Sequence, residues 1–126
     1  METPSFPLQE TFARQFAQDW VEAWNSHDLD RIMAHYEDEV TLTSPVALNL
    51  LKNGTGAVQG KASLREYFAR GLQAYPQVRF ELQDVLWGVE TLVLCYANNV
   101  RGSKTAEVMQ LAPSGKIRRV WANYDR

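Results

Sequence analysis

Cysteine is almost absent from this sequence, since Cys95 is the only one in 126 residues. One cysteine excludes an internal disulfide, and with only two histidines no cysteine–histidine cluster has the spacing of a metal site. Cys95 lies in the apolar run LVLCYA, where a buried core thiol is the ordinary interpretation, and no activating base is visible in the sequence. We therefore predict neither a metal ion nor an organic cofactor.

Long hydrophobic runs and a strong excess of charge are also missing. No stretch of about 18 apolar residues occurs, which argues against a helix that spans a membrane. The formal net charge of -2 leaves no basic footprint for nucleic acid or for an anionic membrane surface. The start of the chain lacks the pattern of a signal peptide. These absences predict a cytoplasmic protein without nucleic-acid or membrane partners.

The residues that are present suit a small mixed domain. Apolar residues make up 45% of the sequence, enough to fill one core, so we predict that residues 1–126 form a single domain. Phe12, Phe16 and Trp20 recur at every fourth position, which predicts a long amphipathic helix. This helix is expected to end near Ser26, because serine does not favour a helix interior.

A second, shorter helix is expected next. Ser26 or Asp28 would cap it. Its expected buried residues are Leu29, Ile32, Met33 and Tyr36. The Glu-Asp-Glu sequence at 37–39 is interpreted as a polar break, and the alternation over 40–43 predicts a strand that ends at Pro45.

Residues 46–60 form the least regular segment of the sequence. Their first half is rich in leucine, and their second half contains the turn sequence Asn-Gly-Thr-Gly at 53–56. The leucines favour a flap over a cavity or a subunit contact rather than disorder. A third helix is expected over 60–71, ending before Pro76.

From Gln77 onward the pattern changes to a period of two. Alternation over 78–86, 91–100, 105–111 and 117–124 predicts four strands. The connections between them are short enough for an antiparallel meander. Three helices followed by such a sheet are an α+β layout.

Three segments carry a resemblance to a known family: WxxxWNSHDLDRIMAHYEDEVTLTSP, GxxxLREYFARGL and EVMQLAPSGKIRRVWANY. They cover most of the chain, and the sequence resembles the nuclear transport factor 2-like (NTF2-like) superfamily and, within it, the SnoaL-like proteins. The resemblance implies a cone-shaped α+β barrel of the cystatin-like type, with three N-terminal helices packed in the concavity of a curved antiparallel sheet. It also implies a pocket at the open end and a homodimer through the outer face of the sheet. The scaffold hosts isomerases, cyclases, dehydratases, epoxide hydrolases and binding proteins, so it does not fix an activity.

The steroid isomerase branch of this superfamily gives a test of specific residues. Its catalytic aspartate, in the strand before a proline, corresponds to Ser44 here, and its tyrosine donor on the first helix corresponds to Trp20. Its protonated aspartic acid on a late strand corresponds to Glu107. Serine is no base near neutral pH without an activator, and an indole cannot titrate. We therefore do not predict the steroid isomerase reaction.

Glu107 is the carboxylate of greatest interest. Period two places it on one face of its strand with Met109 and Leu111, so this face is expected to point inward. Burial would raise the pKa of its carboxyl and suit it to acid–base chemistry near neutral pH. The alternative is an ion pair with Arg118 or Arg119, which are expected to point to opposite faces.

Several other residues are candidates for the same pocket. The resemblance implies that Tyr36 assists catalysis, and that Trp20 and Tyr67 or Phe68 line the cavity, although aromatic residues at helical spacing are more often core. Strand parity adds Asn98, Met109 and Tyr124. Ser44 is either a ligand donor or a residue that bonds local backbone before Pro45. Asp84 is a second carboxylate that parity turns inward, and His35 is a weak candidate base.

Two functions of different classes remain open. In the first, the protein is a cofactor-free isomerase, cyclase or (de)hydratase that acts on a small hydrophobic metabolite by general acid–base chemistry. In the second, it is a non-catalytic ligand-binding or dimerisation module whose pocket is plugged by residues 46–51. For the homodimer, Trp121 is expected on the outer face of the sheet, where Val85 and Trp87 are expected to join it.

Overall fold

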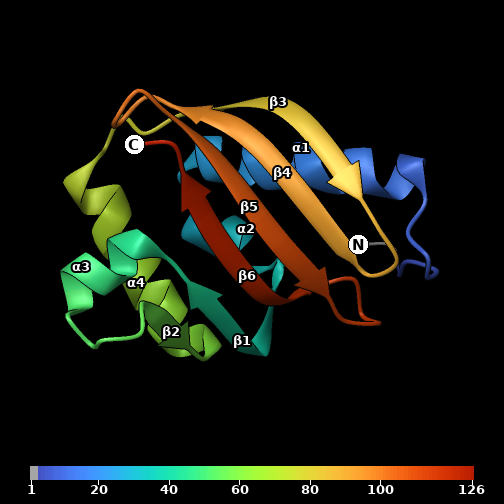
Figure 1. Cartoon of the computed structure of the whole chain (residues 1–126), viewed down its shortest axis with the longest axis horizontal. Coiled ribbons are helices and arrows are strands. Elements are labelled where there is room, and N and C mark those ends of the chain that lie inside the picture. The colour runs from blue at the N-terminus through green and yellow to red at the C-terminus, as the bar shows by residue number, and fades with distance from the viewer. Residues whose placement is uncertain (1–2) are drawn as a thin grey trace.

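The structure is a computed structural model that describes residues 3–126. It consists of a curved six-stranded sheet in the order β2-β1-β6-β5-β4-β3, with α1 and α2 behind the sheet in the view of Figure 1. The first half of the chain contains α1 (Glu10–Ser26), α2 (Leu29–Met33), β1 (Tyr36–Thr43), α3 (Pro45–Leu51), β2 (Ala57–Gln59) and α4 (Lys61–Ala74). The second half contains β3 (Phe80–Trp87), β4 (Thr91–Asn98), β5 (Ser103–Leu111) and β6 (Ile117–Tyr124). This is the α+β fold of the cystatin-like and NTF2-like type that the sequence predicts.

The expected break between the first two helices is confirmed. α1 buries Phe16 and Trp20 from its apolar stripe and ends at Ser26. The next residue, His27, takes a left-handed conformation with φ of 59°. The side chain of Asp28 then accepts hydrogen bonds from the backbone N–H groups of Asp30 and Arg31, which caps α2.

The second helix is shorter than predicted, and the strand after it begins earlier. α2 ends at Met33, and Tyr36 is the first residue of β1 rather than part of the helix. The Glu-Asp-Glu sequence at 37–39 is therefore not a break but lies within the strand. An irregularity in the pairing of β1 with β6 between Tyr36 and Thr41 explains this, because it lets two consecutive acidic residues face solvent.

Residues 46–60 are more regular than predicted. Ser44 accepts a hydrogen bond from the backbone N–H of Val46 and caps α3, with Pro45 in the first helical turn. Asn53 accepts two backbone hydrogen bonds in the turn that follows, as its sequence indicates. β2 then pairs with β1, so the segment is a helix and an edge strand rather than a loop.

The antiparallel meander of β3, β4, β5 and β6 is confirmed. The sheet as a whole is not purely antiparallel, however, because β6 pairs with β1 in parallel. Between β1 and β3 the chain passes through α3, β2 and α4 and re-enters the sheet at its far edge. The meander therefore starts with β3 at one edge of the sheet and runs back across it until β6 lies beside β1 (Figure 1).

An irregularity in β3 reverses the predicted facing of its second half. The pairing with β4 shifts between Leu82 and Asp84. As a result Val85 and Trp87 pack against the core, while Asp84 and Leu86 are exposed. The predictions that Asp84 points inward and that Val85 and Trp87 lie on the outer face were therefore wrong.

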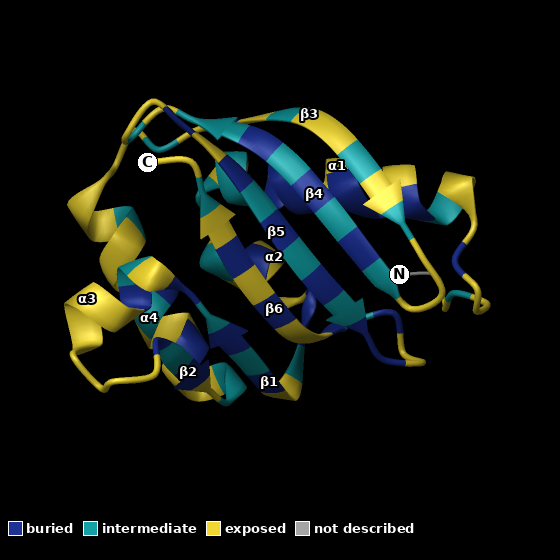
Figure 2. Ribbon diagram, viewed as in Figure 1, coloured by how far each residue is buried: buried dark blue, intermediate teal, exposed yellow. Residues whose placement is uncertain are grey.

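The core lies between the helices and the concave face of the sheet. Buried positions alternate along β4, β5 and β6, which appear as dark bands in Figure 2. The largest fully buried aromatic side chains are Trp20 and Tyr36. Within residues 3–126, no helix combines the length and the apolar character needed to cross a membrane.

Candidate functional site

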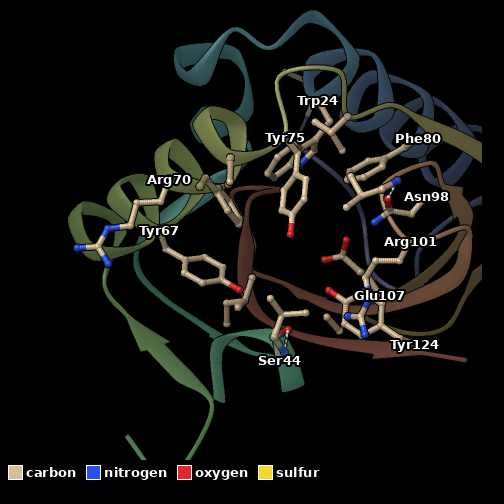
Figure 3. A pocket seen from close by; sticks show the side chains of 18 of the residues that line it. Trp24, Ser44, Tyr67, Arg70, Tyr75, Phe80, Asn98, Arg101, Glu107 and Tyr124 are labelled. Atoms are coloured by element: carbon tan, nitrogen blue, oxygen red, sulfur yellow. Dashed lines mark hydrogen bonds between the residues drawn. The ribbon is translucent and has the colours of Figure 1, made fainter. Parts of the chain in front are cut away.

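A cavity of about 470 Å³ opens between α4, the first turns of α3 and the concave face of the sheet. Its wall is mainly apolar, with a few polar side chains that come from different elements (Figure 3). The lining residues that carry polar groups are Trp24, Ser44, Tyr67, Arg70, Tyr75, Tyr96, Asn98, Arg101, Glu107 and Tyr124. This size and character are those of sites for small organic molecules.

Within residues 3–126, Glu107 is the only acidic residue that lines the cavity, and it projects from the inner face of β5. Its side chain is only 6% exposed. The hydroxyl of Tyr96, on the neighbouring strand β4, donates a hydrogen bond of 2.5 Å to its Oε2 atom. The other oxygen, Oε1, has no hydrogen-bond partner within residues 3–126 and is not sealed from the cavity. One carboxyl oxygen is thus held by the protein while the other faces the cavity.

Burial raises the pKa of Glu107 from its ordinary value of 4.5 to about 7, although the hydrogen bond from Tyr96 acts in the opposite direction. The cost of ionisation comes from the loss of water around the carboxylate, and a single hydroxyl donor replaces only part of that solvation. At neutral pH the protonated and ionised forms are therefore both populated. A carboxyl in this state can give or accept a proton without a metal ion.

In the described part of the chain, no arginine forms an ion pair with Glu107. Arg118 and Arg119 are both exposed, because the pairing of β5 with β6 is irregular at this point and Arg118 falls in the irregularity. The expectation that they point to opposite faces was therefore wrong. Within residues 3–126 the ion pairs are Arg14 with Glu10 and Arg65 with Asp30, both on the surface.

Phenol groups surround the carboxyl on the other sides of the cavity. Burial raises the pKa of Tyr67, on α4, to about 12, and burial also raises the pKa of Tyr124, on β6. The nearby hydroxyl of Ser44 offsets part of both shifts. Both phenols therefore stay neutral near pH 7 and can donate or accept a hydrogen bond. In Figure 3 the hydroxyls of Tyr67 and Tyr75 point into the cavity.

Six of the nine predicted site residues line the cavity: Ser44, Tyr67, Phe68, Asn98, Glu107 and Tyr124. Two of these six also serve the local backbone, since Ser44 caps α3 and Asn98 accepts a hydrogen bond from the N–H of Val100. The other three, Trp20, Tyr36 and Met109, are fully buried and are not among the lining residues.

Trp20 and Tyr36 form a buried pair in the core. The indole N–H of Trp20 donates to the hydroxyl of Tyr36 at 3.1 Å. Burial and the neighbouring Glu107 charge raise the pKa of Tyr36, so the phenol stays protonated. This pair lies close enough to Glu107 for its charge to act on the phenol, and a part for Tyr36 in catalysis stays a prediction.

α3 borders the mouth of the cavity and does not fill it. Val46 and Leu50 contribute to the lining, and the three leucines of this helix are exposed, Leu48 by 41%, Leu50 by 56% and Leu51 by 38%. A cavity of about 470 Å³ remains beside them. The plugged pocket considered above is therefore not what the structure contains.

The family model for the SnoaL-like domain matches residues 17–122. The chain belongs to the SnoaL-like family. A SnoaL-like protein of unknown function from Burkholderia thailandensis is 30% identical, with a TM-score of 0.90 over 94% of this chain and 98% of that one. An NTF2-like protein of unknown function from Cytophaga hutchinsonii is 15% identical, with a TM-score of 0.67 over 94% of each chain.

A third similar structure belongs to an enzyme. SalBIII, described as an epoxide hydrolase/cyclase-like enzyme with a role in pyran ring formation in polyether salinomycin, is 20% identical, with a TM-score of 0.70 over 92% of each chain. A comparison with curated proteins found no match. The predicted membership of the NTF2-like superfamily is thus confirmed, while the likeness to SalBIII shows the fold alone.

Sequence reasoning missed several residues of this SnoaL-like cavity. Tyr96 shares strand parity with Asn98, so the pattern that predicted Asn98 could also have placed Tyr96 on the face of the cavity. Trp24 follows Trp20 by one helical turn and reads simply as core. Tyr75 and Arg101 lie just beyond the ends of α4 and β4, where periodicity gives no direction for a side chain.

His35, considered as a weak candidate base, is not part of the cavity. It is 7% exposed, its Nδ1 atom is bonded to the carbonyl of Arg31, and its ring meets the edge of Phe16. Burial lowers its pKa below the ordinary value of 6.5. It therefore belongs to the packing of α2 against α1.

Proposed function

We propose that this SnoaL-like protein binds a small, mostly apolar molecule in the cavity and that Glu107 transfers a proton to or from it. The reaction would be an isomerisation, a cyclisation or a (de)hydration, which need no more than a positioned acid or base and neutral donors. The observation that carries the proposal is the carboxyl of Glu107, in which only Oε2 is hydrogen-bonded to the protein. Within residues 3–126 this carboxyl is buried, has no arginine as a partner and is open to the cavity through Oε1.

The parts of the site have distinct roles in this proposal. Tyr96 holds Oε2 and fixes the orientation of the carboxyl, so proton transfer takes place at Oε1. Tyr67 and Tyr124 stay protonated and donate hydrogen bonds to oxygen atoms of the substrate. Phe68 and Phe80 supply the apolar wall. Below a pH of about 7 Glu107 serves as the acid, and above it as the base.

A simple carbon acid tests the catalytic part of the proposal without knowledge of the natural substrate. 5-Nitrobenzisoxazole is small, planar and apolar; a base removes its ring C–H proton, the N–O bond breaks, and a coloured nitrile phenolate forms. We expect turnover that rises with pH around a midpoint near 7, the pKa of Glu107. Glu107→Gln should lower this rate by about 10²-fold or more.

The matched control is Glu81→Gln, which removes an exposed carboxylate from β3 and should leave the rate unchanged. A rate that is the same in both variants and in the parent protein would rule out Glu107 as the base for a molecule in the cavity.

Binding is measured separately with N-phenyl-1-naphthylamine, a neutral dye that fluoresces in apolar sites. The parent protein should bind it, and Gly71→Leu should weaken binding, because Gly71 borders the cavity and a Cβ added there meets no atom within 4 Å. The added leucine is expected to take up space at the mouth. Failure of the parent protein to bind the dye would contradict the binding part of the proposal.

A further inference from the structure

We propose that the molecule bound in this cavity is an organic anion, a carboxylate in the first place, and that Arg101 binds its negative group at the mouth. This inference rests on the proposed function, because it names the chemical class of the ligand for the same cavity. It is carried by the position of Arg101, by its lack of a charged partner and by the balance of charge around the cavity.

Arg101 lies in the turn between β4 and β5 and lines the cavity. Its guanidinium carbon stands 5.8 Å from the centre of the Tyr124 ring, a cation–π contact that holds the group against the cavity wall. Contact with the face of a ring leaves the N–H groups at the edge of the guanidinium free for other partners. The arginine is therefore held in place by a contact that does not use its donors.

Within residues 3–126 the guanidinium of Arg101 has neither an ion-pair partner nor a hydrogen-bond partner. The opposite charges of Glu107 and Arg101 both act on the phenol of Tyr124, one raising its pKa and the other lowering it. Tyr124 thus lies within reach of both groups, and a ligand beside its ring would meet the acid on one side and the arginine on the other.

The charge around the cavity favours an anion. Two arginines and one carboxyl line it, and burial keeps a large part of that carboxyl protonated at neutral pH. Among the described charged residues that line the cavity, positive charge therefore exceeds negative charge, although the whole chain carries a net charge of -2. Of the two arginines, Arg70 points its guanidinium away from the cavity in Figure 3, which leaves Arg101 as the group that can meet a ligand.

A carboxylate fits this arrangement best among small anions. The planar guanidinium offers parallel N–H groups that match the two oxygen atoms of a carboxylate. Arg101 is exposed and Glu107 is buried, so the charged end of the ligand would stay near solvent while its apolar body enters the cavity. The bond that reacts would then lie in the body of the ligand, at Glu107, and not at its charged end.

The test uses two dyes that differ in one charged group. 8-Anilinonaphthalene-1-sulfonate carries a sulfonate that stays ionised at all working pH values, and N-phenyl-1-naphthylamine is the same molecule without it. Fluorescence titrations of the parent protein and of Arg101→Gln give the affinity for each dye. We expect Arg101→Gln to weaken binding of the sulfonate about threefold to tenfold, because the arginine is partly solvated, and to leave the neutral dye unchanged.

The control variant is Arg79→Gln. Arg79 is exposed and lies beside the same turn, where its backbone is bonded to Asn99, but it does not line the cavity. Arg79→Gln removes one positive charge near the mouth and should change the affinity for either dye by no more than about twofold. Arg101→Lys, which keeps the charge without the planar fork, should give an intermediate affinity for the sulfonate.

The outcomes separate the inference from the proposed function. If the parent protein binds the neutral dye but Arg101→Gln affects the sulfonate no more than Arg79→Gln does, the inference is wrong and the proposed function stands. If the parent protein binds neither dye, both are overturned. Selective loss of the sulfonate in Arg101→Gln supports both.

Discussion

Glu107 is a buried carboxyl whose ionisation opposes folding. The pKa of its carboxyl is about 7 in the folded protein, and the unfolded chain has the ordinary value of 4.5. Between pH 4.5 and pH 7 the folded chain therefore binds more protons than the unfolded chain. Stability must then fall as the pH rises from about 4.5 to about 7. A shift of this size corresponds to at most about 3 kcal/mol in the free energy of unfolding.

Glu107→Gln removes this dependence. We expect the variant to be more stable than the parent protein at pH 8, by up to about 3 kcal/mol, and of similar stability at pH 4.5. Urea unfolding at both pH values measures the difference. His35 acts in the opposite direction, because its lowered pKa makes stability fall as the pH drops below 6.5. Since His35 is present in both proteins, only the difference between them reports on Glu107.

Single positions of the site could be predicted from strand parity where the strands are regular. Parity placed Glu107, Asn98 and Tyr124 on the concave face, and all three line the cavity. It could not show that Tyr96 bonds the carboxyl, because this depends on the register between β4 and β5. Nor could it place Arg101, since a turn residue has no periodic neighbour to fix its direction.

The glycines of α4 and of the turn before β2 provide a test at the level of elements. Gly71 lies inside α4, where an added Cβ meets no atom within 4 Å. Gly71→Ala should therefore stabilise the protein by about 0.5 to 1 kcal/mol, because glycine loses more backbone entropy in a helix than alanine does. The free energy of unfolding in urea checks this value.

Gly56→Ala is the opposite case and serves as the control. Gly56 has a φ of 72°, and a Cβ there would lie 2.8 Å from the carbonyl oxygen of Ser44. We expect this variant to lose at least about 1 kcal/mol, because the backbone would have to move or remain strained. If both variants changed stability in the same direction, the conformations described for α4 and for this turn would be wrong.

Elements were predictable where one periodicity persists and not where the pairing is irregular. The stripe of Phe12, Phe16 and Trp20 continues over about two turns of α1, and helix and burial follow it. In β3 one extra residue near Gln83 reverses the face on which every later side chain of the strand lies. The alternation in the sequence continues across this position, so the sequence gives no sign of the irregularity. Similarly, the short α3 depends on its cap at Ser44 more than on any repeat.

At the level of the whole molecule, the convex face of the sheet carries an apolar row that a monomer would leave in water. In the strand register, Leu86 pairs with Val93, Val93 with Val108, and Val108 with Trp121. These four side chains therefore lie side by side across β3, β4, β5 and β6 on the face opposite the cavity. Leu86 is 54% exposed and Trp121 is 39% exposed. A continuous apolar row of this kind is typical of a contact surface.

We expect the protein to form a homodimer through this row, with the two cavities facing outward. Trp121→Arg would place a charge at the β6 end of this contact and should convert the dimer to a monomer at micromolar concentration, as measured by sedimentation equilibrium. The fold should survive, because Trp121 is already partly in solvent and its inner neighbours Val120 and Ala122 remain. Leu48→Arg, on the exposed side of α3, is the matched control and should leave the dimer intact. A parent protein that sediments as a monomer would contradict the predicted dimer. A dimer that Leu48→Arg breaks and Trp121→Arg does not would place the contact away from the sheet.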